Sequence, residues 1–341
     1  MAPGDKKFAE WLFRPAPIKG ELLSSWLTRI AYFHCYSFYE FCEGEWPGQR
    51  YHYHDIDITA PNRLIQRLAE NTVASLYQTT ESTLRTYEGI LFDRALSGAK
   101  TRFVLPAGAN SRTVFSAGMQ WCPICLDCDE TPYWRKIWRL AFMTACSEHQ
   151  IVLADRCSNC GVRAIPRRRA DLRCYNCLED YRSHPQQPAY IEALKFQNKL
   201  ESLLSDPGSY KKMDKASEKN VSDHFRAKWH LLRLVMVSRD AVGLCEEIDK
   251  YLKFKMRAPN RALKLAWRLE AEGVNERHRA IRRVAMIQGK YPLLISLCKS
   301  AGINWAKISR GTEFTPYPPI MLNAFSDGLR ERPIENYRNR L

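Results

Sequence analysis

The N-terminal part of the chain has apolar positions at helical spacing. From Leu23 to His34 they recur at i, i+3, i+4, i+7, i+8 and i+11, which predicts one amphipathic helix. The pattern breaks near Cys35, and Ser37-Phe-Tyr-Glu40 then has the sequence of a capping box that starts a second helix. A helix, a short turn and a capped helix are the outline of a helix-turn-helix, although any αα-corner of a helical domain has the same outline.

The next segment predicts shorter elements. Residues 51–59 alternate apolar and polar side chains, which is typical of a strand. Within them Asp55-Ile-Asp57-Ile-Thr59 matches the DxDxT pattern of aspartyl-phosphate phosphotransferases, whose first aspartate ends a buried parallel strand. Because helical sequence follows instead of an α/β domain, we interpret the match as coincidental. Helices are predicted at 62–70 and at 81–88, the second capped by Thr80.

A further helix is predicted at 134–145. Its aromatic and small residues fall on one helical face, which we expect to pack into a core. The opposite face carries Arg135, Lys136 and Arg139. The end of this helix would deliver Cys146 and His149, and residues 151–153 would return as a strand.

The strongest pattern is four pairs of metal-ligand residues, each pair enclosing two residues. Two ligands at this spacing reach one ion from a tight turn, and four pairs make two closed tetrahedral sites of the structural zinc kind. The first predicted site is Cys122, Cys125, Cys146 and His149, and the second is Cys157, Cys160, Cys174 and Cys177. We therefore expect two structural Zn²⁺ ions as the cofactors of the chain.

Other interpretations of these cysteines fit less well. A disulfide framework needs an oxidising compartment, and the N-terminus shows no apolar signal segment. A ferredoxin run would place a cysteine where Pro132 stands. A catalytic zinc would keep one position for water, whereas each group here offers four protein ligands. A Cys–His nucleophile pair would leave the pairing of eight residues to coincidence, and Cys128 is a spare cysteine without an assigned role.

The composition is that of a globular protein with surplus positive charge. Its 341 residues are 45% hydrophobic and 26% charged, and no apolar run approaches the roughly 18 residues of a membrane helix. The net charge of +15 favours a polyanionic partner, above all nucleic acid, although many basic cytosolic proteins bind nucleic acid only weakly. Reduced cysteines favour the cytoplasm.

Basic residues concentrate in two segments. The arginine-rich loop from Arg163 to Arg173 suits contacts to phosphate or to an acidic protein surface, and a merely solvated loop would look the same. Residues 253–290 hold 11 Lys/Arg against three Glu, and residues 292–311 follow with the outline of a second helix-turn-helix. The candidate nucleic-acid or partner contacts are Arg163, Arg167, Arg168, Arg169, Arg173, Arg261, Lys264, Arg282, Arg283, Lys307 and Arg310.

The predicted fold is mainly α with little β, in three domains. Residues 1–117 form a helical domain with the helix-turn-helix outline, residues 118–182 a tandem zinc-binding module like a double zinc ribbon, and residues 190–341 a helical basic domain. Since the sequence has no Walker loop, HExxH motif, nucleophile elbow or defensible carboxylate constellation, we expect a binding protein and not an enzyme.

Several motifs together resemble the TniQ family, over about residues 10–180. They are Gly20-Glu-Leu-Leu-Ser-Ser-Trp26-Leu-Thr-Arg29-Ile-Ala31, Gln120-Trp-Cys122-Pro-Ile-Cys125-Leu-Asp127, Pro132-Tyr133, Trp138-Arg-Leu140, Cys146-Ser-Glu-His149 and Cys157-Ser-Asn-Cys160. Beyond residue 190 only a general helical character is shared with the family.

The resemblance implies a target-selection protein of a bacterial transposon. In CRISPR-associated members, TniQ joins an RNA-guided Cascade effector at the target DNA to the AAA+ regulator TnsC, which recruits the transposase. The longer TnsD relatives instead bind a fixed attachment site on DNA directly, and this role or that of a zinc-containing transcription regulator is the alternative. The length of 341 residues favours the TniQ type. Relatives often work as dimers, so homodimerisation stays open.

Overall fold

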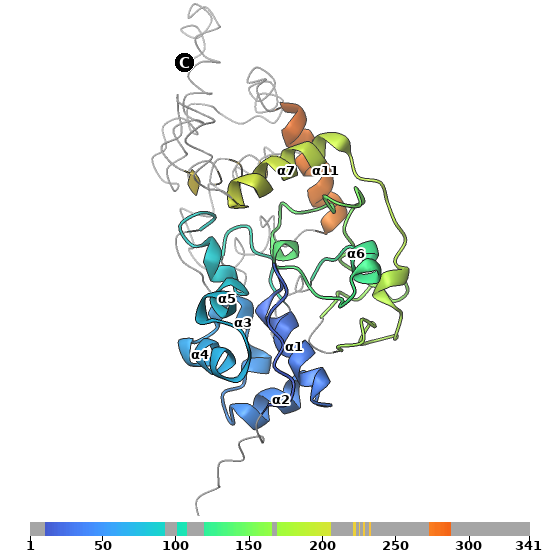
Figure 1. The fold of residues 1–341 in the computed structure, drawn as a ribbon. Helices are drawn as coiled ribbons and strands as arrows, with labels where there is room; N and C mark the ends of the chain where they lie inside the picture. Colours follow the sequence, from blue (N-terminus) through green and yellow to red (C-terminus); the bar gives the residue numbers. More distant parts are fainter. Residues whose placement is uncertain are drawn as a thin grey trace, which may run out of the picture. The chain divides into compact units, whose positions relative to one another are not determined.

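The computed structural model describes residues 11–92, 101–107, 119–165, 169–205 and 273–287, with isolated positions between 221 and 232. These residues form helices and irregular segments joined by isolated β-bridges, which confirms a mainly α fold with little β (Figure 1). The chain divides into two compact units, Met1–Ala189 with Glu270–His278, and Tyr190–Leu269 with Arg279–Leu341. The three-domain boundaries stay predictions, and the helix-turn-helix predicted at 292–311 lies outside the described residues. None of the helices described is long and apolar enough to cross a membrane.

Helices α1 (Leu23–Phe33) and α2 (Phe38–Glu45) confirm the two helices predicted near the N-terminus. The apolar stripe of α1 is buried in a core that includes Trp11 and Phe41. Cys35 makes the turn between the helices with a left-handed backbone, at φ 61°. Both arms of the capping box are present, since Ser37 N donates to Glu40 Oε2 at 2.8 Å and Glu40 N donates to Ser37 Oγ at 3.2 Å. A helix-turn-helix role for this pair stays a prediction.

The strand predicted at 51–59 is wrong. This segment folds into two short helices, η1 (Tyr51–Tyr53) and α3 (Ile56–Thr59). The alternation misleads because its polar position, Asp57, is as deeply buried as the apolar Ile56 and Ile58.

Arg139 explains why an aspartate is buried here. Its guanidinium has no exposed surface, with Nη1 2.8 Å from Asp57 Oδ2 and Nη2 2.5 Å from Asp55 Oδ2. Arg139 Nε donates to the Leu105 carbonyl at 2.9 Å, and Asp57 accepts the N–H and the hydroxyl of Ser24 at 2.7 and 2.8 Å. Burial raises the pKa of Asp57, and the positive charge of Arg139 opposes that rise. The DxDxT segment thus joins the start of α1 to the segment that contains Arg139.

Helix α4 (Asn62–Asn71) confirms the helix predicted at 62–70. The helix predicted at 81–88 is wrong. Helix α5 (Leu76–Glu81) ends at the residue where the predicted helix begins, and the short helix η2 (Leu84–Tyr87) covers only part of the predicted range. Ser75 caps α5 through a capping box with Gln78. Thr80 lies inside α5, and its hydroxyl donates to the Leu76 carbonyl at 2.8 Å.

The position of this cap can be tested by two single substitutions. Ser75→Ala is expected to lower the free energy of unfolding by about 1 kcal/mol, because the Gln78 N–H loses its acceptor. Thr80→Ala is the matched control, expected to change it by less than about 0.5 kcal/mol. Urea denaturation followed by circular dichroism compares the two, and a larger loss for Thr80→Ala would contradict a helix that is capped by Ser75.

The helix predicted at 134–145 is also wrong, since only one turn, η3 (Lys136–Arg139), is helical. Lys136 and Arg139 are buried together with the aromatic positions, so this segment has no exposed basic face. Its backbone instead bridges to two distant segments, in the pairs Glu21–Arg135 and Val104–Leu140, and to the nearby Val152 through Ala145. In the segment 151–153, predicted as a strand, Ile151 and Val152 take part in isolated bridges of this kind and Leu153 does not.

The described residues also include α6 (Pro123–Cys128), η5 (Tyr181–Ser183), α7 (Ile191–Ser205) and α11 (Val274–Ile287). Helix α7 belongs to the second unit and buries one apolar face that includes Leu200 and Leu203. The first turn of α11 belongs to the first unit.

Candidate metal centres

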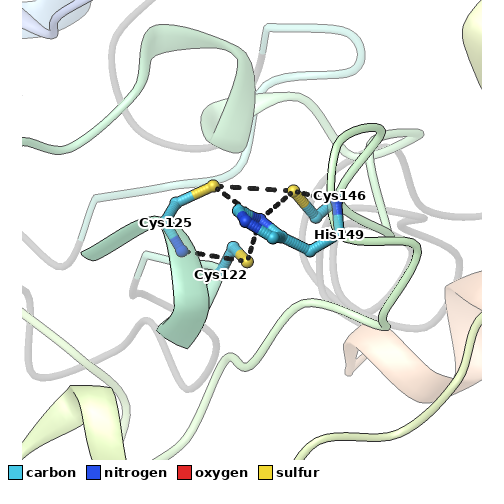
Figure 2. Close-up of side chains that lie close together, drawn as sticks. All are labelled: Cys122, Cys125, Cys146 and His149. Atoms are coloured by element: carbon cyan, nitrogen blue, oxygen red, sulfur yellow. Dashed lines mark hydrogen bonds between the residues drawn. The ribbon is translucent and has the colours of Figure 1, made fainter. Parts of the chain in front are cut away.

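The first group of ligand residues is assembled from a helix N-terminus and a turn. Cys122 caps the N-terminus of helix α6, and its Sγ accepts the N–H of Cys125 at 3.4 Å. Pro123 takes the first helical position, where no N–H is needed. Cys146 and His149 come from one turn, in which His149 N donates to Cys146 Sγ at 3.5 Å. Figure 2 shows the four side chains converging from these two elements.

Distances inside this group fit a four-coordinate metal ion. His149 Nδ1 lies 3.5, 3.3 and 3.4 Å from the Sγ atoms of Cys122, Cys125 and Cys146, and the Cys125 and Cys146 sulfurs are 3.6 Å apart. A tetrahedral ion with metal–sulfur bonds of about 2.3 Å separates its ligand atoms by roughly 3.5–3.8 Å. A disulfide needs sulfurs about 2.05 Å apart. The group is therefore a candidate metal site.

The second group is assembled from two turns. Cys157 Sγ lies 3.5 Å from Cys177 Sγ, and Cys160 Sγ lies 3.6 Å from Cys174 Sγ. All four sulfurs lie within 4.8 Å of one another. The structure thus gathers the eight residues into the two groups that their spacing predicts, and either group could hold a metal ion.

Three of the four ligand pairs share one backbone geometry. The residue after the second ligand has a left-handed backbone and donates its N–H to the carbonyl of the first ligand at 2.9–3.0 Å. These residues are Gln150, Gly161 and Leu178, with φ of 54°, 71° and 65°. The left-handed step lets the chain turn back so that both ligands face one point. Glycine is the sequence signal for such a step, and only Gly161 provides it.

Hydrogen bonds to sulfur favour the thiolate of one cysteine in each group, while the hydrogen bond with Cys122 raises the pKa of the Cys125 thiol. The thiols of Cys122 and Cys125 lower the pKa of the Cys146 thiol far below its usual range. In the second group, a backbone hydrogen bond from Val162 lowers the pKa of the Cys160 thiol to about 6, while burial raises the pKa of Cys157 to about 12. Each group thus contains a sulfur that ionises readily, which is the form that binds a metal ion.

Residues 12–153 match the sequence model of the TniQ family. The chain carries a TniQ domain. The matched segment includes α1, α2 and all four residues of the first metal group, and the second group lies beyond its end. No curated protein matches the chain. A TniQ domain implies a target-selection adaptor in transposition, whose partners are DNA and the transposition machinery.

Trp121 joins the TniQ domain to the second metal group. It is fully buried just before the first ligand, and its Nε1 donates to the Tyr181 carbonyl at 2.9 Å. The two rings pack with centroids 4.7 Å apart, and Trp134 contacts both rings. Because Tyr181 follows Cys177, the last ligand of the second group, by four residues, both metal groups share one aromatic core.

A second connection, which no sequence motif indicated, involves Gln120 and Arg277. Both are buried, and Arg277 donates to Gln120 Oε1 at 3.0 Å and to the Ala141 carbonyl at 2.7 Å. Gln120 Nε2 in turn donates to the carbonyls of Leu140 and Met143. The two partners are 157 residues apart in the sequence, so a local pattern could not have predicted their contact.

The structure describes four of the predicted basic contacts in full. Arg163 pairs with Asp155 at 3.3 Å, Arg169 pairs with Asp171, and Arg173 is exposed. In the second unit, Arg282 stacks on Tyr190 at 4.0 Å and pairs with Glu192 at 3.4 Å. Arg167, Arg168, Arg261, Lys264, Lys307, Arg310 and the side chain of Arg283 lie outside the described residues. A role of any of these residues in binding stays a prediction.

Proposed function

We propose that this protein is a non-catalytic targeting adaptor of a CRISPR-associated transposon, acting in the bacterial cytoplasm. It links the RNA-guided Cascade effector at the target DNA to the AAA+ regulator TnsC, which recruits the transposase. The TniQ domain carries this proposal, because target selection is the role that the domain implies. The net charge of +15 supports contacts to guide and target backbones, while base pairing supplies the sequence recognition.

Zinc is the ion that we propose for both metal groups. Three thiolates with one imidazole, and four thiolates, are donor sets of structural zinc sites. Four protein ligands leave no coordination position for a reacting water. In this proposal the ions cross-link turns, and the residues of the two groups keep the docking surfaces of the adaptor rigid.

Copurification tests the adaptor role. Tagged protein coexpressed with Cascade, guide RNA and TnsC is expected to retain both partners after nuclease treatment. The isolated protein is expected to bind duplex DNA weakly, with equal affinity for the target and for a shuffled duplex, and with an affinity that falls steeply as salt rises. A discrete footprint on one DNA site by the isolated protein would contradict the proposal and favour direct, TnsD-like target selection.

A further inference from the structure

A cavity of about 310 Å³ lies in the first unit, between α1 and the loop of the second metal group. Its volume is at the lower end of the range of ligand-binding pockets, about 300–1,000 Å³, which suits one or two planar rings. Helix α1 contributes Arg29, Tyr32 and Phe33 to the wall. The opposite side carries Arg169, Asp171 and Arg182, and residues 130–134 close the cavity.

Two aromatic rings of this wall face solvent. Tyr32 is 58% exposed and Phe33 is 40% exposed. Phe13 stacks on Phe33 with ring centroids 5.5 Å apart, and Tyr32 meets Phe33 edge-on at 6.2 Å. The rings are therefore held in place by one another while they stay open to a ligand. Solvent-facing aromatic rings beside a cavity are a platform on which a planar group can stack.

The arginines of the opposite side are held in place yet keep donors available. Arg169 and Arg182 each bind a neighbouring aspartate, Asp171 or Asp180, through Nε and Nη2. No hydrogen bond of their Nη1 groups is found among the described residues, and the two side chains are 37% and 42% exposed. A guanidinium fixed along one edge can offer its other edge to a phosphate.

The charges of the lining nearly balance. The lining contains three arginines, Arg29, Arg169 and Arg182, and two acidic residues, Glu130 and Asp171. Outside the lining, Glu21 forms an ion pair with Arg29 and Asp180 forms one with Arg182. A duplex is bound mainly through many phosphate contacts along its length, whereas the described lining offers only the two guanidinium edges of Arg169 and Arg182. Stacking on aromatic rings needs exposed bases, which only an unpaired strand offers.

We propose that this cavity binds unpaired nucleotides of a DNA or RNA strand, with a base stacked on Tyr32 and the adjoining phosphate bound by Arg169 and Arg182. The site lies beside the second metal group, whose loop between Cys160 and Cys174 supplies one wall. The inference does not depend on the link to Cascade and TnsC, because it concerns binding by the isolated chain.

Fluorescence anisotropy of the metal-loaded full-length protein tests the site. Labelled oligo-thymidylate and oligo-uridylate of twelve nucleotides are the unpaired probes, and a duplex of the same length is the reference. Tyr32→Ala is expected to weaken binding of an unpaired probe about tenfold, since stacking of one base contributes roughly this much. Tyr77→Ala is the matched control, because Tyr77 is also a helical tyrosine, is 73% exposed and does not line the cavity.

Salt dependence tests the phosphate contacts separately. Arg182→Gln is expected to reduce the slope of log affinity against log salt by about one, whereas Tyr32→Ala leaves that slope unchanged. A difference between the two probes would identify DNA or RNA as the preferred strand. The proposal is overturned if the unpaired probes do not bind at all, or if Tyr32→Ala and Tyr77→Ala bind them equally well. A loss of TnsC or Cascade binding in Tyr32→Ala, with unchanged affinity for the probes, would make the cavity a protein-docking site instead.

Discussion

Replacing Cys125 with serine is expected to unfold the first unit at ordinary temperature. Cys125 is buried, and its Sγ lies within 3.6 Å of both His149 Nδ1 and Cys146 Sγ, so the substitution removes one of four ligands at the centre of the group. A structural zinc site contributes on the order of 10 kcal/mol to folding, while a whole domain is stable by only about 5–15 kcal/mol. Thermal unfolding and metal analysis of the purified protein are the measurements.

Cys128→Ser is the control, because Cys128 lies in the same short helix, is exposed and belongs to neither metal group. This variant is expected to retain both ions and the stability of the parent protein within about 0.5 kcal/mol. Cys125→Ser is expected to lose one ion per chain and its cooperative transition. A Cys125→Ser protein that keeps two ions, or that unfolds at the parent temperature, would contradict the assignment of the first group.

Replacing Arg139 with methionine is expected to lower the free energy of unfolding by about 3–5 kcal/mol, because it leaves the buried Asp57 and the half-buried Asp55 without their cation. The carbonyl of Leu105 also loses its donor. Since burial already raises the pKa of Asp57, this carboxyl is expected to take up a proton in the variant, which limits the loss. Urea denaturation gives the difference directly.

Two further variants separate charge from packing. The first is a triple variant that combines Arg139→Met with Asp55→Asn and Asp57→Asn. It is expected to recover part of the stability lost in Arg139→Met, because no buried carboxylate is then left unpaired. Arg135→Met is the matched control in the same segment, with an expected loss of about 1 kcal/mol, since its pair with Asp129 is partly exposed. If Arg135→Met and Arg139→Met lower the free energy of unfolding equally, the buried ion cluster contributes no more to stability than the partly exposed pair.

Features of the fold that depend on neighbouring residues could be predicted from the sequence. The ligand pairs around Cys157 and Cys174 are local, and so is the capping box at Ser37. The cap at Ser75 is also local, and its signal is Gln78 at the third helical position. The predicted cap at Thr80 overlooks this signal, so that error was avoidable.

The remaining errors arise from contacts between distant residues. Asp57 has the pattern of a solvent-facing strand position, and Arg139, 82 residues later, makes it a buried one. Residues 134–145 have a helical pattern of apolar positions. In the structure, other segments cover both faces of this stretch and bind to its backbone. A pattern within twelve residues cannot show contacts with other segments. The candidate cavity was missed for the same reason, since α1 and Arg182 lie in separate parts of the sequence.

The contact between Gln120 and Arg277 has a consequence for biosynthesis. The first unit cannot complete its interior when the last metal ligand, Cys177, has been translated, because Arg277, the partner of Gln120, follows 100 residues later. At about 5–20 residues per second, the nascent chain waits on the order of ten seconds with an unfilled place beside Gln120. We expect metal binding to hold the partly folded chain together during this interval, until the first turn of α11 has been translated.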